Sequence, residues 1–89
     1  MSFKVLIHPK VFEIVPVDRR NRIKEALLEL KDPLPEGNKK EVKGSHKTIY
    51  RLRSGEFRIL YEIDFERSEV LVFNIITAEQ AHKKYNRFK

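Results

Sequence analysis

Three arginines near the middle of the chain have a spacing suited to binding phosphate. Arg51, Arg53 and Arg58 lie in two runs of alternating apolar and polar residues, and Ser54 and Gly55 between the runs predict a hairpin turn. The alternation places all three guanidinium groups on one face of the hairpin. With this turn Arg51 lies directly opposite Arg58, and like charges in that position destabilise a pair of strands. Because guanidinium groups match the oxygens of phosphate, the pair indicates an anion-binding surface.

The glutamates of the same hairpin leave a second interpretation open. The predicted turn places Leu52 opposite Phe57 on the apolar face and Arg53 opposite Glu56. Glu56 and Glu62 could neutralise the arginines, or the arginines could simply be solvated, as exposed charged side chains usually are. The sequence does not choose between an anion site and these alternatives.

The N-terminal part predicts a strand and two helices that position the hairpin. Residues 3–8 are rich in β-forming side chains, and residues 9–15 predict a short helix that starts at a proline. A second helix is predicted from an N-cap at Asp18 to about Lys31, with apolar residues at helical spacing. Two such helices, antiparallel to each other, can cover one side of a sheet.

The remaining residues predict three strands and a C-terminal helix. The hairpin strands cover 48–53 and 56–64, and the apolar run 70–76 predicts a central strand buried on both faces. Thr77 to Gln80 fits a capping box, so a short last helix is expected to begin at Ala78. The predicted fold is α+β in the order β-α-α-β-β-β-α. Its helical hairpin covers one face of a four-stranded, mainly antiparallel sheet, and the arginines lie on the open face.

Composition limits the class of protein. The 89 residues predict a single domain over 1–89, and a net charge of +6 is typical of proteins with nucleic-acid or acidic partners. The absence of cysteine excludes disulfides and thiolate chemistry. The apolar run at Val5–Ile7 is far too short for a membrane span, so we expect a soluble cytoplasmic protein.

The hairpin motif and its flanking segments resemble the RelE/ParE superfamily of toxins from toxin–antitoxin pairs. The run from Tyr50 to Glu62 reads Tyr-Arg-Leu-Arg-x-Gly-x-Phe-Arg-Ile-Leu-Tyr-Glu, and it follows a two-helix opening, an Asp-Pro loop and the segment Val42–Gly44. The resemblance implies a basic, concave sheet face. In RelE-like members this face docks in the ribosomal decoding site and cleaves messenger RNA, with the 2′-hydroxyl as nucleophile. It also implies a cognate antitoxin as partner and no cofactor or metal.

The motif also implies which residues carry the reaction. Arg51 and Arg58 match functional basic positions of the family, and Tyr85 best matches its C-terminal tyrosine. His82 lies one helical turn before Tyr85 and is a candidate for proton transfer near neutral pH, although a lone helical histidine is more often merely exposed. Arg53 is expected to share the charge stabilisation or to bind a flanking phosphate. The basic run 39–43 and the tail 83–89 are expected to supply further phosphate contacts. The residues named for this role are Lys43, Lys47, Lys83, Lys84 and Arg87.

Two departures from the family pattern keep other functions open. A family lysine falls at Ile49, where Lys47 would have to substitute, and residues 77–79 lack the arginine of the Gly-His-Arg-like turn that many members carry. The first alternative is a non-enzymatic, ParE-like inhibitor of DNA gyrase. The second is a degenerate member that binds antitoxin or RNA without nuclease activity.

Overall fold

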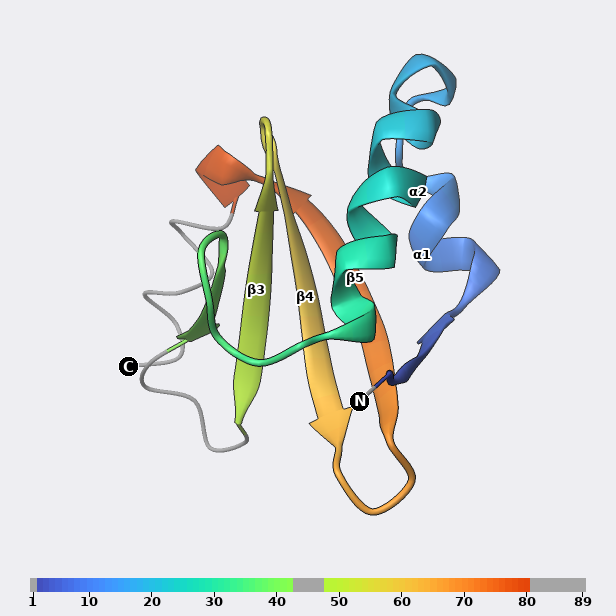
Figure 1. The fold of residues 1–89 in the computed structure, drawn as a ribbon. Helices are drawn as coiled ribbons and strands as arrows, with labels where there is room; N and C mark the ends of the chain where they lie inside the picture. The colour runs from blue at the N-terminus through green and yellow to red at the C-terminus, as the bar shows by residue number, and fades with distance from the viewer. Residues whose placement is uncertain (1, 43–47, 81–89) are drawn as a thin grey trace.

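The computed structural model describes residues 2–42 and 48–80, and these form an α+β fold (Figure 1). The strands are β1 (Lys4–Ile7), β2 (Lys39–Val42), β3 (Ile49–Ser54), β4 (Phe57–Asp64) and β5 (Glu69–Thr77). The helices are α1 (Pro9–Glu13) and α2 (Arg20–Leu28), and α2 is preceded by the 3-10 turn η1 (Val17–Arg19) and followed by η2 (Glu29–Lys31).

The sheet has five strands in the order β1-β5-β4-β3-β2, so the predicted four-stranded sheet is wrong in its count. The additional strand is β2, which pairs antiparallel with β3 at the sheet edge. Its sequence, Lys-Lys-Glu-Val, has little β-propensity, and cross-strand pairing holds it in the sheet. β1 runs parallel to β5, whereas the other neighbours are antiparallel, which makes the sheet mixed.

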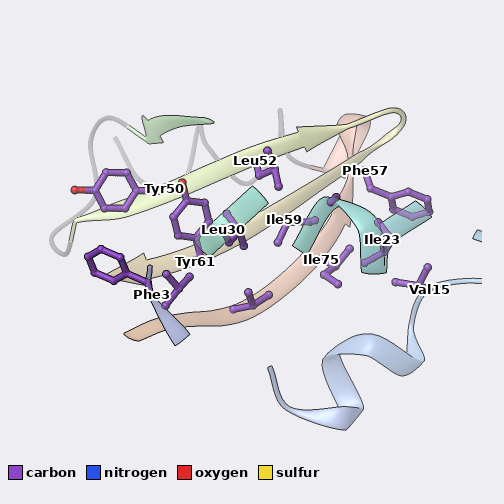
Figure 2. Close-up of a cluster of buried hydrophobic side chains, with 13 residues drawn as sticks. Phe3, Val15, Ile23, Leu30, Tyr50, Leu52, Phe57, Ile59, Tyr61 and Ile75 are labelled. Atoms are coloured by element: carbon purple, nitrogen blue, oxygen red, sulfur yellow. The ribbon is translucent and has the colours of Figure 1, made fainter. Parts of the chain in front are cut away.

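The helices α1 and α2 both lie on one face of the sheet, as predicted (Figure 1). Ile23 and Leu30, from α2 and η2, are fully buried against Leu52, Ile59 and Tyr61 of the central strands (Figure 2). Burying one such side chain stabilises the fold by about 1.5–3 kcal/mol. The core therefore fixes one face of β3 and β4 and leaves their other face to carry the polar residues.

The N-cap predicted at Asp18 is wrong, although the helical segment ends at Lys31 as expected. Helical backbone begins earlier, in η1, where the Arg19 N–H bonds to the carbonyl of Pro16 at 2.9 Å. No side chain caps η1 or α2. The Asp18 carboxylate instead lies 3.7 Å from the Arg19 guanidinium. The N-cap position is therefore Pro16, which has an extended backbone and lies two residues before Asp18.

The hairpin turn consists of Gly55 and Glu56 and not of Ser54 and Gly55, because Ser54 pairs with Phe57. Gly55 has φ +57°, the conformation that the first position of a primed two-residue turn requires and that glycine adopts without strain. The strands are consequently shifted by two residues relative to the prediction. A shift of two keeps every side chain on its predicted face but changes its partner on the other strand.

Tyr61 connects the sheet to the loop before β2 through a hydrogen bond. Its hydroxyl donates a 2.8 Å hydrogen bond to the carbonyl of the buried Pro33, and its ring stacks on Tyr50 at a centroid distance of 5.5 Å. Tyr50 lies directly opposite Tyr61, two residues from the partner that the predicted turn would give it. Burial raises the pKa of Tyr61 well above its ordinary value, with a smaller contribution from Tyr50. Burial also raises the pKa of Tyr50, and the nearby Glu41 adds to that effect.

β5 has one residue without a partner in its antiparallel pairing with β4. Leu60 pairs with Asn74 but Tyr61 pairs with Val72, so Phe73 is the surplus residue of a β-bulge. The strand is central as predicted, but it is not buried on both faces along its whole length, because Phe73 is 39% exposed and its neighbour Leu71 is 38% exposed. Both lie in the half of β5 beside β1.

The capping box predicted after β5 is present. The Gln80 N–H donates to Thr77 Oγ1 at 3.2 Å, and the Thr77 N–H donates to Gln80 Oε1 at 3.0 Å. Residues 78–80 are helical, and the rest of the predicted last helix lies outside the described residues. Within 2–42 and 48–80, no helix is long and apolar enough to cross a membrane.

Candidate nucleic-acid interface

The three arginines of the hairpin share one face of the sheet, opposite the face that α1 and α2 cover. We call this the arginine face; it carries Arg51, Arg53 and Arg58. Arg51 and Arg53 are two residues apart on β3, and Arg53 lies directly opposite Arg58 of β4. Their neighbours Leu52 and Ile59 are fully buried on the helix side, which fixes the orientation of both strands. The predicted common face is confirmed.

The like-charged pair is Arg53 and Arg58, so the predicted pairing of Arg51 with Arg58 is wrong. The shifted turn places Arg51 opposite Leu60 instead. Arg58 Nη1 donates to the backbone carbonyls of Gly55 at 3.0 Å and Phe57 at 2.9 Å, which holds it against the turn. Two guanidinium groups in directly opposite positions concentrate positive charge where the hairpin ends.

Glu56, the carboxylate nearest in sequence to Arg53 and Arg58, is paired with a residue outside this face. Glu56, expected opposite Arg53, instead forms an ion pair of 2.9 Å with Arg19 on the helix side. Among the described residues neither Arg51 nor Arg53 forms an ion pair. Arg53 makes a long hydrogen bond of 3.5 Å to the Asn38 side chain and is otherwise exposed. Within 2–42 and 48–80, Arg51 and Arg53 are therefore not paired with a carboxylate.

The register shows which described lysine of the basic run 39–43 projects from the arginine face. Lys40 of β2 lies directly opposite Arg51, so its side chain projects from the arginine face, and it is exposed. The neighbouring Lys39 points the other way, and its Nζ donates to the carbonyl of Asp32 at 2.6 Å. A run of lysines in the sequence does not reveal which of them faces the arginines, because the pairing with β3 decides it.

Beside these charges the arginine face is apolar. Leu60 and Ile76 form a small buried cluster on this side of the sheet, separate from the main core. Ile49, the position where the sequence resemblance places a family lysine, pairs with Val42, and both are buried. In this chain position 49 therefore makes an apolar contact and contributes no positive charge to the arginine face.

Most of the other predicted site residues lie outside the described residues. They are the lysines and the arginine expected to bind RNA and the two expected catalytic residues of the last helix, namely Lys43, Lys47, Lys83, Lys84, Arg87, His82 and Tyr85. His8, the only described histidine, caps α1 by accepting a 3.1 Å hydrogen bond from the Lys10 N–H. In the part of the chain that the structure describes, no three histidine or carboxylate side chains gather as metal ligands would.

The chemistry available on the arginine face is electrostatic. Guanidinium groups stay protonated at any working pH and can stabilise charge that develops on a phosphate in a transition state. They are poor proton donors and acceptors for the same reason, so a complete cleavage site needs other groups as acid and base. Among the described residues, the arginine face offers cations of this kind.

Comparison with known proteins defines the class. The sequence model of the ParE toxin of the type II toxin–antitoxin system parDE matches residues 16–82. The chain therefore belongs to the RelE/ParE superfamily and is a toxin of the type II toxin–antitoxin class. No curated protein matches the sequence.

Solved structures of RelE toxins have the same fold. RelE in the RelE–RelB complex of Pyrococcus horikoshii is 21% identical with a TM-score of 0.69, over 86% of this chain and 96% of that one. The Mycobacterium tuberculosis RelBE2 toxin–antitoxin complex gives 20% identity and a TM-score of 0.70, over 86% and 99%. The isolated E. coli RelE toxin gives 20% and 0.65, over 99% and 100%. At these identities the similarity concerns the fold.

Proposed function

We propose that this toxin inhibits translation by cutting messenger RNA in the ribosome. The observation that carries the proposal is the arginine face. Arg51 and Arg53 project from one side of the sheet without a carboxylate partner among the described residues, and Arg58 adds a third charge. A surface of this kind is stabilised when a polyanion binds. The similarity of the fold to RelE toxins supports RNA as that polyanion.

In the proposed reaction the 2′-hydroxyl of the message attacks the adjacent phosphate and the 5′-oxygen leaves. Arg51 and Arg58 stabilise the negative charge that develops on the phosphate oxygens, and Arg53 shares that role or holds a flanking phosphate. Tyr85 stacks on a base or holds a proton-bearing group, and His82 transfers a proton. No cofactor or metal is needed, because the nucleophile belongs to the substrate.

The proposed physiological partner is a cognate antitoxin. RelE from Pyrococcus horikoshii and from Methanococcus jannaschii was crystallised with RelB, as was the Mycobacterium tuberculosis RelBE2 pair. A net charge of +6 favours an acidic antitoxin. In the cytoplasm, such a partner would cover the basic surface until the toxin is released.

Purified toxin added to translating ribosomes tests the nuclease proposal. Primer extension should show cuts in the ribosomal A site, and Arg51→Ala should slow cutting on the order of 100-fold, the usual cost of removing one group that stabilises transition-state charge. Arg67→Ala is the matched control, since Arg67 is an exposed arginine in the turn between β4 and β5. Intact message at every dose of wild-type toxin would reject the proposal.

Inhibition of DNA gyrase is the second candidate. It is supported by the match to the ParE family model and by the buried isoleucine at position 49, where RelE-like members carry a lysine. A supercoiling assay separates the two functions, because only a gyrase inhibitor leaves relaxed plasmid while the message stays whole. A degenerate member would bind antitoxin yet fail to arrest growth.

A further inference from the structure

The arginine face carries a second like-charged pair across strands. Lys40 of β2 lies opposite Arg51 of β3, just as Arg53 lies opposite Arg58 one row further along the hairpin. The like charges within each pair repel each other. The two like-charged pairs are neighbours on the same face of the sheet. Their proximity indicates that both bind the same ligand.

The environment of Lys40 leaves its ammonium group available. Lys40 is exposed and forms no ion pair with any residue in 2–42 or 48–80. The adjacent Glu41 lies opposite Tyr50 on the helix side, so its backbone position directs its carboxylate away from the arginine face. Lys39 is held on the helix side by its bond to Asp32. Of the two lysines that begin β2, Lys40 is therefore the one placed to meet a ligand of this face.

We propose that Lys40 binds a phosphate of single-stranded RNA together with Arg51, next to the phosphate that Arg53 and Arg58 bind. This inference rests on the proposed function and adds a residue to its site. Successive side chains on one face of a strand are about 7 Å apart, so the two pairs can hold neighbouring phosphates of one strand. The four cations lie on three adjacent strands, and the RNA backbone can therefore bridge from β2 to β4 across β3.

The salt dependence of RNA binding tests the role of Lys40. A labelled single-stranded RNA of 12 nucleotides is titrated with wild-type toxin at several KCl concentrations, and anisotropy gives the affinity. Each phosphate contact contributes roughly 0.7 to the slope of log affinity against log salt for single strands. Lys40→Ala should lower the magnitude of the slope by about that amount and weaken binding several-fold at low salt. Lys40→Arg should retain both the slope and the affinity, since it keeps the charge.

Lys31→Ala is the matched control, because Lys31 is an exposed lysine in η2 on the helix side. Thermal unfolding of each variant checks that the fold is intact. Equal slopes and affinities for Lys40→Ala and Lys31→Ala would overturn the proposal, as would an alanine variant and an arginine variant that lose binding alike.

The ribosome assay run in parallel keeps the two proposals apart. If wild-type toxin binds RNA and Lys40→Ala binds with the smaller slope, but neither cuts message, the nuclease proposal fails and the Lys40 site stands. If both cut message with the same kcat/KM and bind RNA with the same slope, the Lys40 site fails and the nuclease proposal stands. Wild-type toxin that neither binds RNA at low salt nor cuts message overturns both.

Discussion

The buried hydroxyl of Tyr61 gives a stability test of the loop that carries β2. Tyr61→Phe removes the 2.8 Å hydrogen bond to Pro33 and leaves a buried carbonyl without its donor. Losing this hydrogen bond and leaving its buried acceptor unsatisfied should lower the free energy of unfolding by about 2 kcal/mol. For a domain of 89 residues this corresponds to a melting temperature lower by roughly 10 °C. Differential scanning calorimetry at neutral pH measures the change.

The same substitution changes how stability depends on pH. The folded state raises the pKa of Tyr61 above the ordinary tyrosine value of 10.0. This contribution to stability is complete below pH 10 and is lost as the pH rises further, because the unfolded chain then releases a proton that the folded chain keeps. Above pH 10 the free energy of unfolding of wild type should approach that of Tyr61→Phe by up to about 1.4 kcal/mol per pH unit.

Tyr50→Phe is the control for the loss of a hydroxyl. Tyr50 stacks on Tyr61 but its hydroxyl forms no hydrogen bond within the described residues, so this variant should keep the melting temperature within a few degrees. Equal destabilisation by Tyr50→Phe and Tyr61→Phe would refute the reasoning, because the effect would then follow from the rings and not from the bond to Pro33. Parallel curves for wild type and Tyr61→Phe above pH 10 would refute the pKa argument.

Two further substitutions test the turn and the paired charges. Gly55→Ala should lower the free energy of unfolding, measured in urea, by at least roughly 1 kcal/mol. The reason is that φ is +57° at this residue and an added Cβ would lie 3.0 Å from the Arg22 guanidinium. Unchanged stability would contradict the assigned turn. Arg53→Gln should raise the free energy of unfolding by up to about 1 kcal/mol at low salt, by relieving its repulsion with Arg58, while it slows RNA cleavage. A gain that does not shrink in molar salt, where charges are screened, would contradict this explanation.

Local signals in the sequence predicted the features that depend on neighbours in the chain. Thr77 and Gln80 are three residues apart and form the capping box that their spacing indicates. The alternation around Arg51 and Arg58 set the face of each side chain, because that face depends only on the period of two. The helix cap at Asp18 failed because the proline before it started the helical backbone earlier.

Features that depend on pairing between distant segments were not predictable in the same way. The partner of each arginine depended on which two residues form the turn. Gly55 is compatible with both the Ser54–Gly55 turn and the Gly55–Glu56 turn, so the sequence did not decide between them. β2 was not counted among the strands because three of its four residues are charged, and they form a strand only beside β3. The place of Lys40 on the arginine face follows from that pairing, so no pattern within the lysine run could have revealed it.

The bulge at Phe73 decides on which side of the sheet the chain emerges after β5. With the surplus residue, Ile75 faces the helices and Ile76 faces away from them. If β5 instead continued from Val72 without a bulge, Phe73 would pair with Leu60, the two isoleucines would exchange faces, and the capped end at Thr77 would turn toward the opposite side of the molecule. A homologue that lacks this one residue and pairs regularly with β4 is therefore expected to present the segment after β5 to the same surface.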